Sequence, residues 1–160
     1  MGRTSQSNPR YRTKSELCAD IALVLNSSLH YGTKYAVFDN AMWVWTEFEG
    51  KYKGCEYWSE AAQGFSEDQR MLVHEHAVPK KLLIDLLLSL SSPTPDSVQQ
   101  MFQNYCKAAV ITKAEDAALN RLGLRSKMPS DWDGRDPWAR CKAAGIVLRS
   151  QVGERCNTGT

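Results

Sequence analysis

Apolar side chains recur every three or four residues along several segments of the chain, a spacing that predicts amphipathic helices. The clearest segment holds Leu17, Ile21 and Leu25 behind a capping box formed by Thr13 and Glu16. We therefore expect a first helix over about 14–27. The same spacing, with its caps and breaks, predicts further helices over about 34–49, 80–90, 97–107, 113–122 and 137–144.

The caps assigned to the later helices are Pro79 for 80–90, Asp96 with Gln99 for 97–107, Thr112 with Glu115 for 113–122, and Asp136 for 137–144. Gly50 or Gly54 ends the aromatic helix 34–49, whose stripe of large rings is typical of a core face.

Two segments are compatible with strands. Residues 71–78 alternate in a way that suits a short strand, although Ser66 and Gln69 also form a helix-start signal, so both structures stay open there. Residues 108–111 fit a second short strand. The fold class expected is mainly α with a short β element (α+β), as a single compact helical domain over 13–150, with a flexible basic arm, 1–12, and a C-terminal tail, 151–160.

Composition narrows the class of protein. Of the 160 residues, 42% are hydrophobic, which predicts a packed core and excludes a disordered or fibrous chain. No window approaches the ~18 apolar residues of a membrane span, and the first residues do not read as a secretory signal. With five cysteines that lack paired spacing, we expect an intracellular, cytoplasmic protein with reduced thiols and no membrane partner.

Charge is segregated along the chain. Residues 1–14 hold four bases and no acid, and residues 121–149 hold seven bases against three acids. A basic face of this kind can neutralise phosphates. A solvated surface next to a flexible arm explains the pattern equally well.

The segment His74-Glu75-His76 is the most informative for chemistry, because two of the three histidines flank an acid there. On a strand the two imidazoles share one face and can share a metal ion, whereas Glu75 points to the other face. On a helix the two rings diverge and exclude such a shared site.

The piece Glu75-His76-Ala77-Val78-Pro79 resembles the acid-His-x-x-Pro start of the HNH, or ββα-metal, nuclease family. The resemblance implies that His76 is the general base for an attacking water and that Glu75 helps to hold a divalent metal ion (Mg, Mn or Zn). A following helix supplies an Asn or His ligand in that family, and Asn104 on the 97–107 helix is the matching candidate. His74 completes the expected metal set.

Two other interpretations of this segment stay open. The histidines can belong to a structural turn in which they bond backbone carbonyls, or a structural metal site can use Cys55 or Cys106.

A second segment, 124–140, interleaves bases with two tryptophans, as proteins that bind single-stranded nucleic acid do. Its candidate nucleic-acid contacts, with two from the arm, are Arg125, Lys127, Arg135, Arg140, Arg10 and Arg12. The interpretation we prefer is plainer: Trp132 and Trp138 pack against the domain, and Arg135 and Arg140 pair with nearby aspartates.

These observations give two hypotheses. The first is a metal-dependent nucleic-acid hydrolase or a nucleic-acid-binding protein, acting on DNA or RNA, with an HNH-like centre at His76. The alternative is a helical interaction protein, for instance a mobile-element-type regulator or inhibitor, which docks a protein partner through its acidic aromatic region, 36–60, or its basic C-terminal region.

Overall fold

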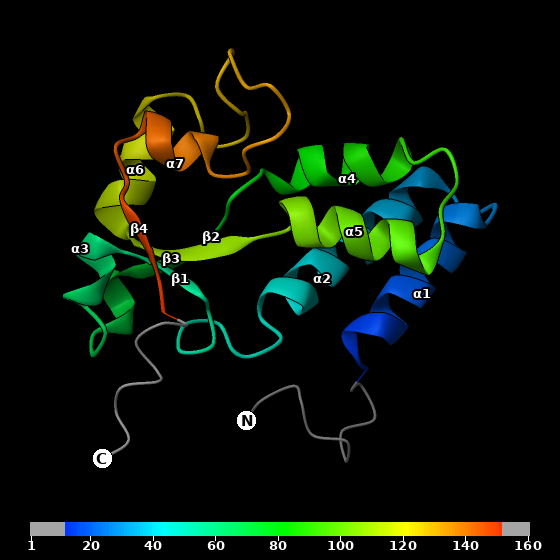
Figure 1. Ribbon diagram of the computed structural model, residues 1–160, viewed down its shortest axis with the longest axis horizontal. Coiled ribbons are helices and arrows are strands. Elements are labelled where there is room, and N and C mark those ends of the chain that lie inside the picture. The colour runs from blue at the N-terminus through cyan, green and yellow to red at the C-terminus, as the bar shows by residue number, and fades with distance from the viewer. Residues whose placement is uncertain (1–11, 152–160) are drawn as a thin grey trace.

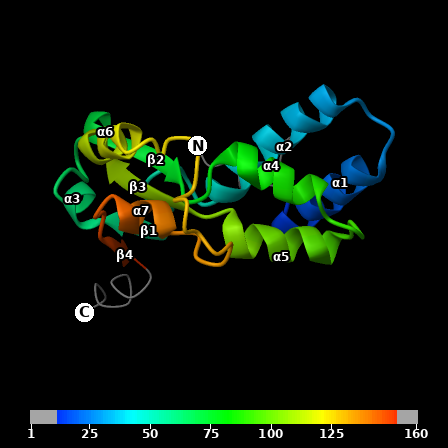
Figure 2. The ribbon, with the colours of Figure 1, turned by 90° about the horizontal axis from the view of Figure 1, so that it is seen from above.

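The computed structural model describes residues 12–151. The predicted arm and tail lie outside these residues except for Arg12 and Gln151. The described chain is α+β, with helices at one end and a small sheet at the other (Figure 1). Figure 2 shows the same division from above.

The helical lobe consists of α1 (Lys14–Asn26), α2 (Tyr31–Thr46), α4 (Lys80–Leu88) and α5 (Pro95–Tyr105). Thr13 and Glu16 cap α1 reciprocally, as predicted. The stripe of α2 is a core face, as expected, because Phe38, Met42 and Trp45 are buried against the other helices. This packing holds the lobe together.

Several predicted helix boundaries were wrong. The α2 helix starts at Tyr31, with His30 as its cap, and ends at Thr46 rather than near Gly50. The α5 helix starts at Pro95 and is capped by Thr94 with Ser97, because Pro at the first helical position displaces the cap to the preceding residue. Helix α7 is shorter than predicted (Ala139–Ala143).

The sheet lobe holds four strands in the order β2-β3-β1-β4. They are β1 (Tyr57–Ser59), β2 (Leu72–His76), β3 (Ala108–Thr112) and β4 (Leu148–Ser150), with α3 (Glu60–Gln63), the 3₁₀ turn Gln69–Met71, α6 (Lys113–Arg121) and α7 around them. Strand β3 pairs antiparallel with β2 and parallel with β1, and β4 pairs antiparallel with β1. The strand predicted at 108–111 is confirmed, and of the two structures left open for 71–78 the chain forms the strand, over Leu72–His76. Strands β1 and β4 were not predicted.

The two faces of the sheet have separate cores. On one face, Val110 and Leu72 pack with Trp58 and Ala62. On the other, Ala109 and Ile111 pack with Leu119 of α6 and Cys141 of α7. The side on which a β2 residue lies therefore determines whether it meets α6 and α7.

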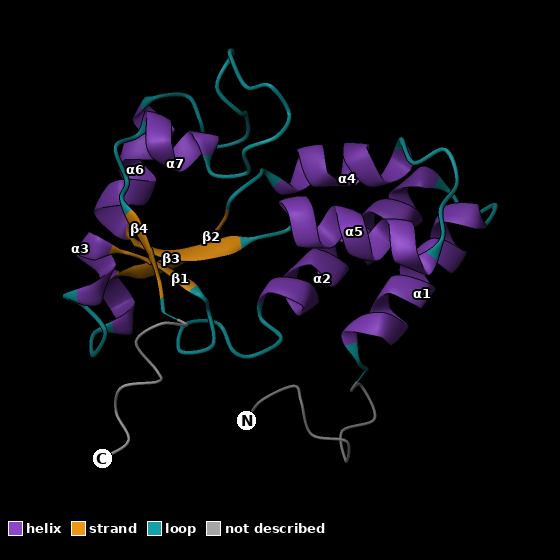
Figure 3. Cartoon of the chain, viewed as in Figure 1, coloured by secondary structure: helices purple, strands orange, loops and turns teal. Residues whose placement is uncertain are grey.

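A loop of residues 122–138 rises from the sheet lobe between α6 and α7 (Figure 3). Across the described residues, no helix combines the length and the apolar character that a membrane span requires.

Candidate functional site

Strand β2 places the three residues of the His-Glu-His segment on two faces of the sheet. Glu75 lies opposite Ala109, whereas His74 and His76 lie opposite Val110 and Ala108. Directly opposed residues of antiparallel strands share a face. Glu75 therefore faces α6 and α7, and both imidazoles face the other way, as expected for a strand.

The two imidazoles are buried beneath Trp43 of α2. The centroids of the two rings are 5.9 Å apart, and the ring planes are nearly parallel. The Trp43 ring meets the His76 ring edge-on, with the two centroids 4.6 Å apart. The Nε2 atom of His76 lies 3.3 Å from Oγ1 of Thr46. Both ring nitrogens of His74 are buried without a hydrogen-bond partner, and Oε1 of Glu47 lies 3.6 Å from Nδ1.

Both rings are neutral near pH 7. Burial, followed by the charge of Lys51, lowers the pKa of His74 to about 4. Burial, followed by the charge of His74, lowers the pKa of His76 to about 3. An imidazole with so low a pKa is a weak proton acceptor.

The two rings do not belong to a complete metal site among the described residues. Their planes are nearly parallel, with 8° between them, and no third His, Cys, Asp or Glu side chain in this part of the chain joins them in a group that could hold a metal ion. The predicted neighbouring ligand, Asn104, is exposed on α5, away from the buried environment of the imidazoles.

On the opposite face, Glu75 forms an ion pair with Arg140 of α7. One guanidinium nitrogen donates to Oε1 of Glu75 over 2.6 Å, and the carboxylate side chain is 23% exposed. The Glu75 side chain is therefore largely buried and keeps a small part of its surface open to solvent.

Arg140 is itself 1% exposed. Its other donors bond the backbone carbonyls of His76, Ala77, Leu124 and Arg125, the last three over 3.0, 2.6 and 3.1 Å. Arg140 was expected either to contact nucleic acid or to pair with Asp131, Asp133 or Asp136. Both expectations were wrong. The guanidinium is buried, and its hydrogen bonds connect the end of β2 to the loop 122–138.

Helix α6 completes the surroundings of Glu75. It begins directly after β3 and is capped by Thr112 with Glu115, as predicted. Burial raises the pKa of the Glu75 carboxyl, the charge and hydrogen bond of Arg140 oppose that rise, and the charges of Asp116 and Arg125 act on the same carboxyl in opposite directions. The Glu75 and Asp116 carboxylates therefore lie within electrostatic reach of each other. Asn120, one turn further along α6, donates to Asp116 over 3.4 Å.

Asp116 was not predicted from the sequence, because the helix that carries a metal ligand was expected at 97–107. The signal that points to α6 was present: a capping box that follows directly on a predicted strand. It indicates a helix that folds back onto that strand.

The remaining predicted nucleic-acid residues are distributed as follows. Arg125, Lys127 and Arg135 are exposed on the loop 122–138, Arg12 is half-buried before α1, and Arg10 lies outside the described residues. The two tryptophans of the loop are packed, as we preferred. Trp132 contacts the helical core and donates to the carbonyl of Asp136 over 2.7 Å, and Trp138 lies 4.9 Å from the Tyr57 ring.

The described part of the chain holds no group of three or more His, Cys, Asp or Glu side chains that could bind a metal ion unaided. Comparison with protein-family models, with curated proteins and with solved structures found no match to this chain.

Proposed function

We propose that this protein is a metal-dependent phosphodiesterase acting on nucleic acid, with its centre on the face of the paired strands β2 and β3 that α6 covers. The observation that carries the proposal is the position of Glu75 on that face, within electrostatic reach of Asp116 of α6. The antiparallel pair β2 and β3, with α6 directly after β3, has the strand, strand, helix order that the ββα-metal resemblance implies, with α4 and α5 inserted between the two strands.

The donors near Glu75 suit a hard divalent ion. Carboxylate oxygens from Glu75 and Asp116, with the Asn120 amide next to them, are the ligand types that Mg²⁺ and Mn²⁺ prefer. Mg²⁺ is commonly held by one or two carboxylates together with substrate phosphates and water. Two protein carboxylates are therefore sufficient here if the nucleic acid brings its phosphate.

When bound, such an ion would lower the pKa of water and offset charge on the phosphate. The protein's own residues have separate tasks. Glu75 and Asp116 would hold the ion, Arg140 orients the Glu75 carboxylate and opposes the rise of its pKa, and the exposed Arg125 guanidinium, which acts electrostatically on Glu75, would attract the scissile phosphate.

The role of His76 as general base stays a prediction. His76 is the last residue of β2, and its ring lies against Trp43 and Thr46 on the side away from Glu75. Reaching a water on the Glu75 side requires the ring to leave those contacts. The alternative of an interaction protein also stays a prediction, but Phe38, Met42 and Trp45 are buried and not offered to a partner.

Calorimetry with Mn²⁺, in the presence of a short oligonucleotide that is made uncleavable by phosphorothioate linkages, tests the ligand assignment. Glu75→Gln and Asp116→Asn should each weaken Mn²⁺ binding by at least about tenfold, or about 1.4 kcal/mol. Asp131→Asn, which alters an exposed aspartate of the loop 122–138, is the matched control. Equal Mn²⁺ affinity in all four proteins would refute the assignment.

A further inference from the structure

Strand β4 lies at one edge of the sheet and pairs, among the described strands, with β1 alone. Figure 2 shows it at the outer margin of the sheet lobe. An edge strand presents backbone N–H and C=O groups that can serve as a template for a further strand. The direction in which these groups point on β4 follows from its pairing with β1.

The outward groups of β4 belong to Leu148. The Glu60 amide donates to the Val147 carbonyl over 3.0 Å, and opposed residues of antiparallel strands alternate between hydrogen-bonded and non-hydrogen-bonded pairs. Leu148 opposes Ser59, one position further along. The Leu148 N–H and C=O therefore point away from β1, and neither has a hydrogen-bond partner within residues 12–151.

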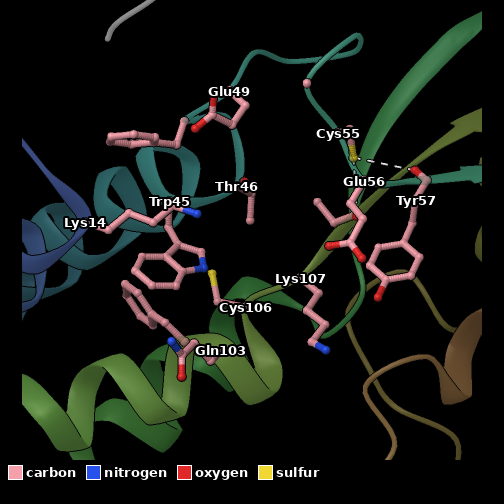
Figure 4. Close-up of a pocket in the computed structure, with 14 residues that line it drawn as sticks. Lys14, Trp45, Thr46, Glu49, Cys55, Glu56, Tyr57, Gln103, Cys106 and Lys107 are labelled. Carbon is pink, nitrogen blue, oxygen red and sulfur yellow. Dashed lines mark hydrogen bonds between the residues drawn. The ribbon is translucent and has the colours of Figure 1, made fainter. Parts of the chain in front are cut away.

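The strand that carries β4 is anchored where it begins. The Cys55 thiol donates to the Tyr57 carbonyl over 3.6 Å (Figure 4) and to the Ala108 carbonyl of β3 over 3.4 Å. The Gln151 amide donates to the Glu56 carbonyl over 2.7 Å, at the same end of the β1–β4 pair. The outward edge of β4 is therefore held in an extended conformation on the sheet.

We propose that β4 pairs antiparallel with β4 of a second copy of this chain, about a two-fold axis at Leu148. An outward N–H and an outward C=O on one residue are complementary to the same two groups of an identical residue. Two copies related by a two-fold axis therefore exchange two hydrogen bonds at this position. The two sheets join into one continuous sheet.

The charges near this edge allow two identical copies to meet. The Arg149 guanidinium is paired with Glu60 of its own chain. The Lys142 ammonium, on α7, is paired with Asp136. Neither cation therefore brings an unpaired like charge to the axis, where it would repel the same cation of the second copy.

An apolar groove of about 460 Å³ lies beside β4. Its lining includes the Tyr57 and Trp138 rings, Leu148 and Val147, and Val147 is 50% exposed. Leu148 packs on the core beneath α7, and directly opposed residues of paired strands share a face. The Leu148 side chain of the second copy therefore lies beside this groove and shields it from water.

Sedimentation equilibrium of the unaltered protein, from micromolar to millimolar concentration, tests the proposal. The mass should rise from one chain to two and then stop, because a two-fold pairing of β4 uses the edge of both copies. A mass of one chain at millimolar concentration overturns the proposal, and so does assembly beyond two chains.

Two variants at Leu148 test the hydrogen bonds themselves. Leu148→Pro removes the outward N–H but none of the donors that bond β1, and proline is found on edge strands in such positions. Leu148→Ala is the matched control, because it loses the side-chain packing and keeps the N–H. Each dimer of Leu148→Pro lacks two donors, so its dissociation constant should be at least about tenfold higher than that of Leu148→Ala. Equal dissociation constants would overturn the proposal.

Amide hydrogen exchange of the unaltered protein keeps the proposal testable if Leu148→Pro does not fold. Exchange of the Leu148 amide should slow at least about tenfold between micromolar and millimolar protein. The Arg149 amide, which points to β1, should be protected at both concentrations. A dimer in which the Leu148 amide exchanges as fast as in the monomer would use another surface, and the proposal would be wrong.

Discussion

The Arg140 guanidinium reaches across from α7 to place one nitrogen 2.6 Å from Oε1 of Glu75 at the edge of the sheet. The two residues are 65 positions apart in the chain. Because Arg140 also bonds the carbonyls of His76 and Ala77, it fixes both the carboxylate and the backbone that follows it. The proposed centre therefore depends on a buried residue that does not touch the substrate.

Replacing Arg140 by Met should destabilise the protein by about 3–5 kcal/mol, because it leaves several buried carbonyls and Glu75 without their partner. Lys should not rescue it, since one ammonium cannot reproduce the guanidinium fork. Urea unfolding measures the effect. The control Arg135→Met, which alters an exposed arginine, should change the free energy of unfolding by less than about 0.5 kcal/mol. If Arg140→Met lost equally little, the structural role of Arg140 would be contradicted.

The imidazole pair predicts a loss of stability in acid. In the unfolded chain a histidine titrates with its ordinary pKa of about 6.5, whereas burial lowers the pKa of His74 to about 4 in the fold. As pH falls below about 6.5, the unfolded state therefore binds more protons than the folded state, so the free energy of unfolding falls. For His74 alone the loss is about 3 kcal/mol by about pH 4.

Urea unfolding between about pH 7.5 and about pH 4.5 measures the slope of the free energy of unfolding against pH. His74→Leu should flatten it and should be neutral or stabilising near neutral pH, because the His74 nitrogens lack partners. If His74→Leu and the unaltered protein lose the same free energy of unfolding as the pH falls, the His74 ring is not the cause of the acid sensitivity.

Trp45→Ala should cost about 3–5 kcal/mol, since the indole is 8% exposed in the helical core and its loss leaves a cavity. Thermal or urea unfolding gives the value. Phe48, which belongs to the stripe of large rings predicted on 34–49, is only half-buried beyond the end of α2, so Phe48→Ala should cost less. A stable Trp45→Ala variant that loses a binding partner would instead favour the interaction-protein hypothesis.

The bases of the loop 122–138 should determine how strongly nucleic-acid binding depends on salt concentration. Each phosphate neutralised contributes about 0.9 to the slope of log K against log salt on duplex DNA. The triple variant Arg125→Ala, Lys127→Ala, Arg135→Ala should therefore flatten that slope by up to about 3 units. Affinity measured at several salt concentrations tests this, with Lys81→Met as the single-charge control. An unchanged slope in the triple variant would remove the loop from the interface.

Local signals predicted the helices well, because caps such as Thr13 with Glu16 and Thr112 with Glu115 act within one turn. Strands β1 and β4 are three residues long and depend on pairing with each other and with β3. No local pattern of that length distinguishes a strand from a loop.

The candidate site was only partly predictable for a similar reason. Alternation along β2 correctly separated Glu75 from the two imidazoles. The pairing with Arg140 and the approach of Asp116 arise from tertiary packing over long sequence distances. Arg140 looked like a surface base because nothing in its neighbouring residues signals that it is buried.

Hydrolysis of a fluorescent single-stranded oligonucleotide with Mg²⁺, Mn²⁺ or Zn²⁺, compared between the unaltered protein, Glu75→Gln and Glu67→Gln, tests the central claim most directly. Circular dichroism should first show that all three proteins are folded. We predict metal-dependent cleavage by the unaltered protein and by Glu67→Gln, and a loss of at least about a hundredfold in Glu75→Gln, or about 2.7 kcal/mol. Cleavage by Glu75→Gln at the unaltered rate, or no cleavage by the unaltered protein with any of the three ions, would contradict the account.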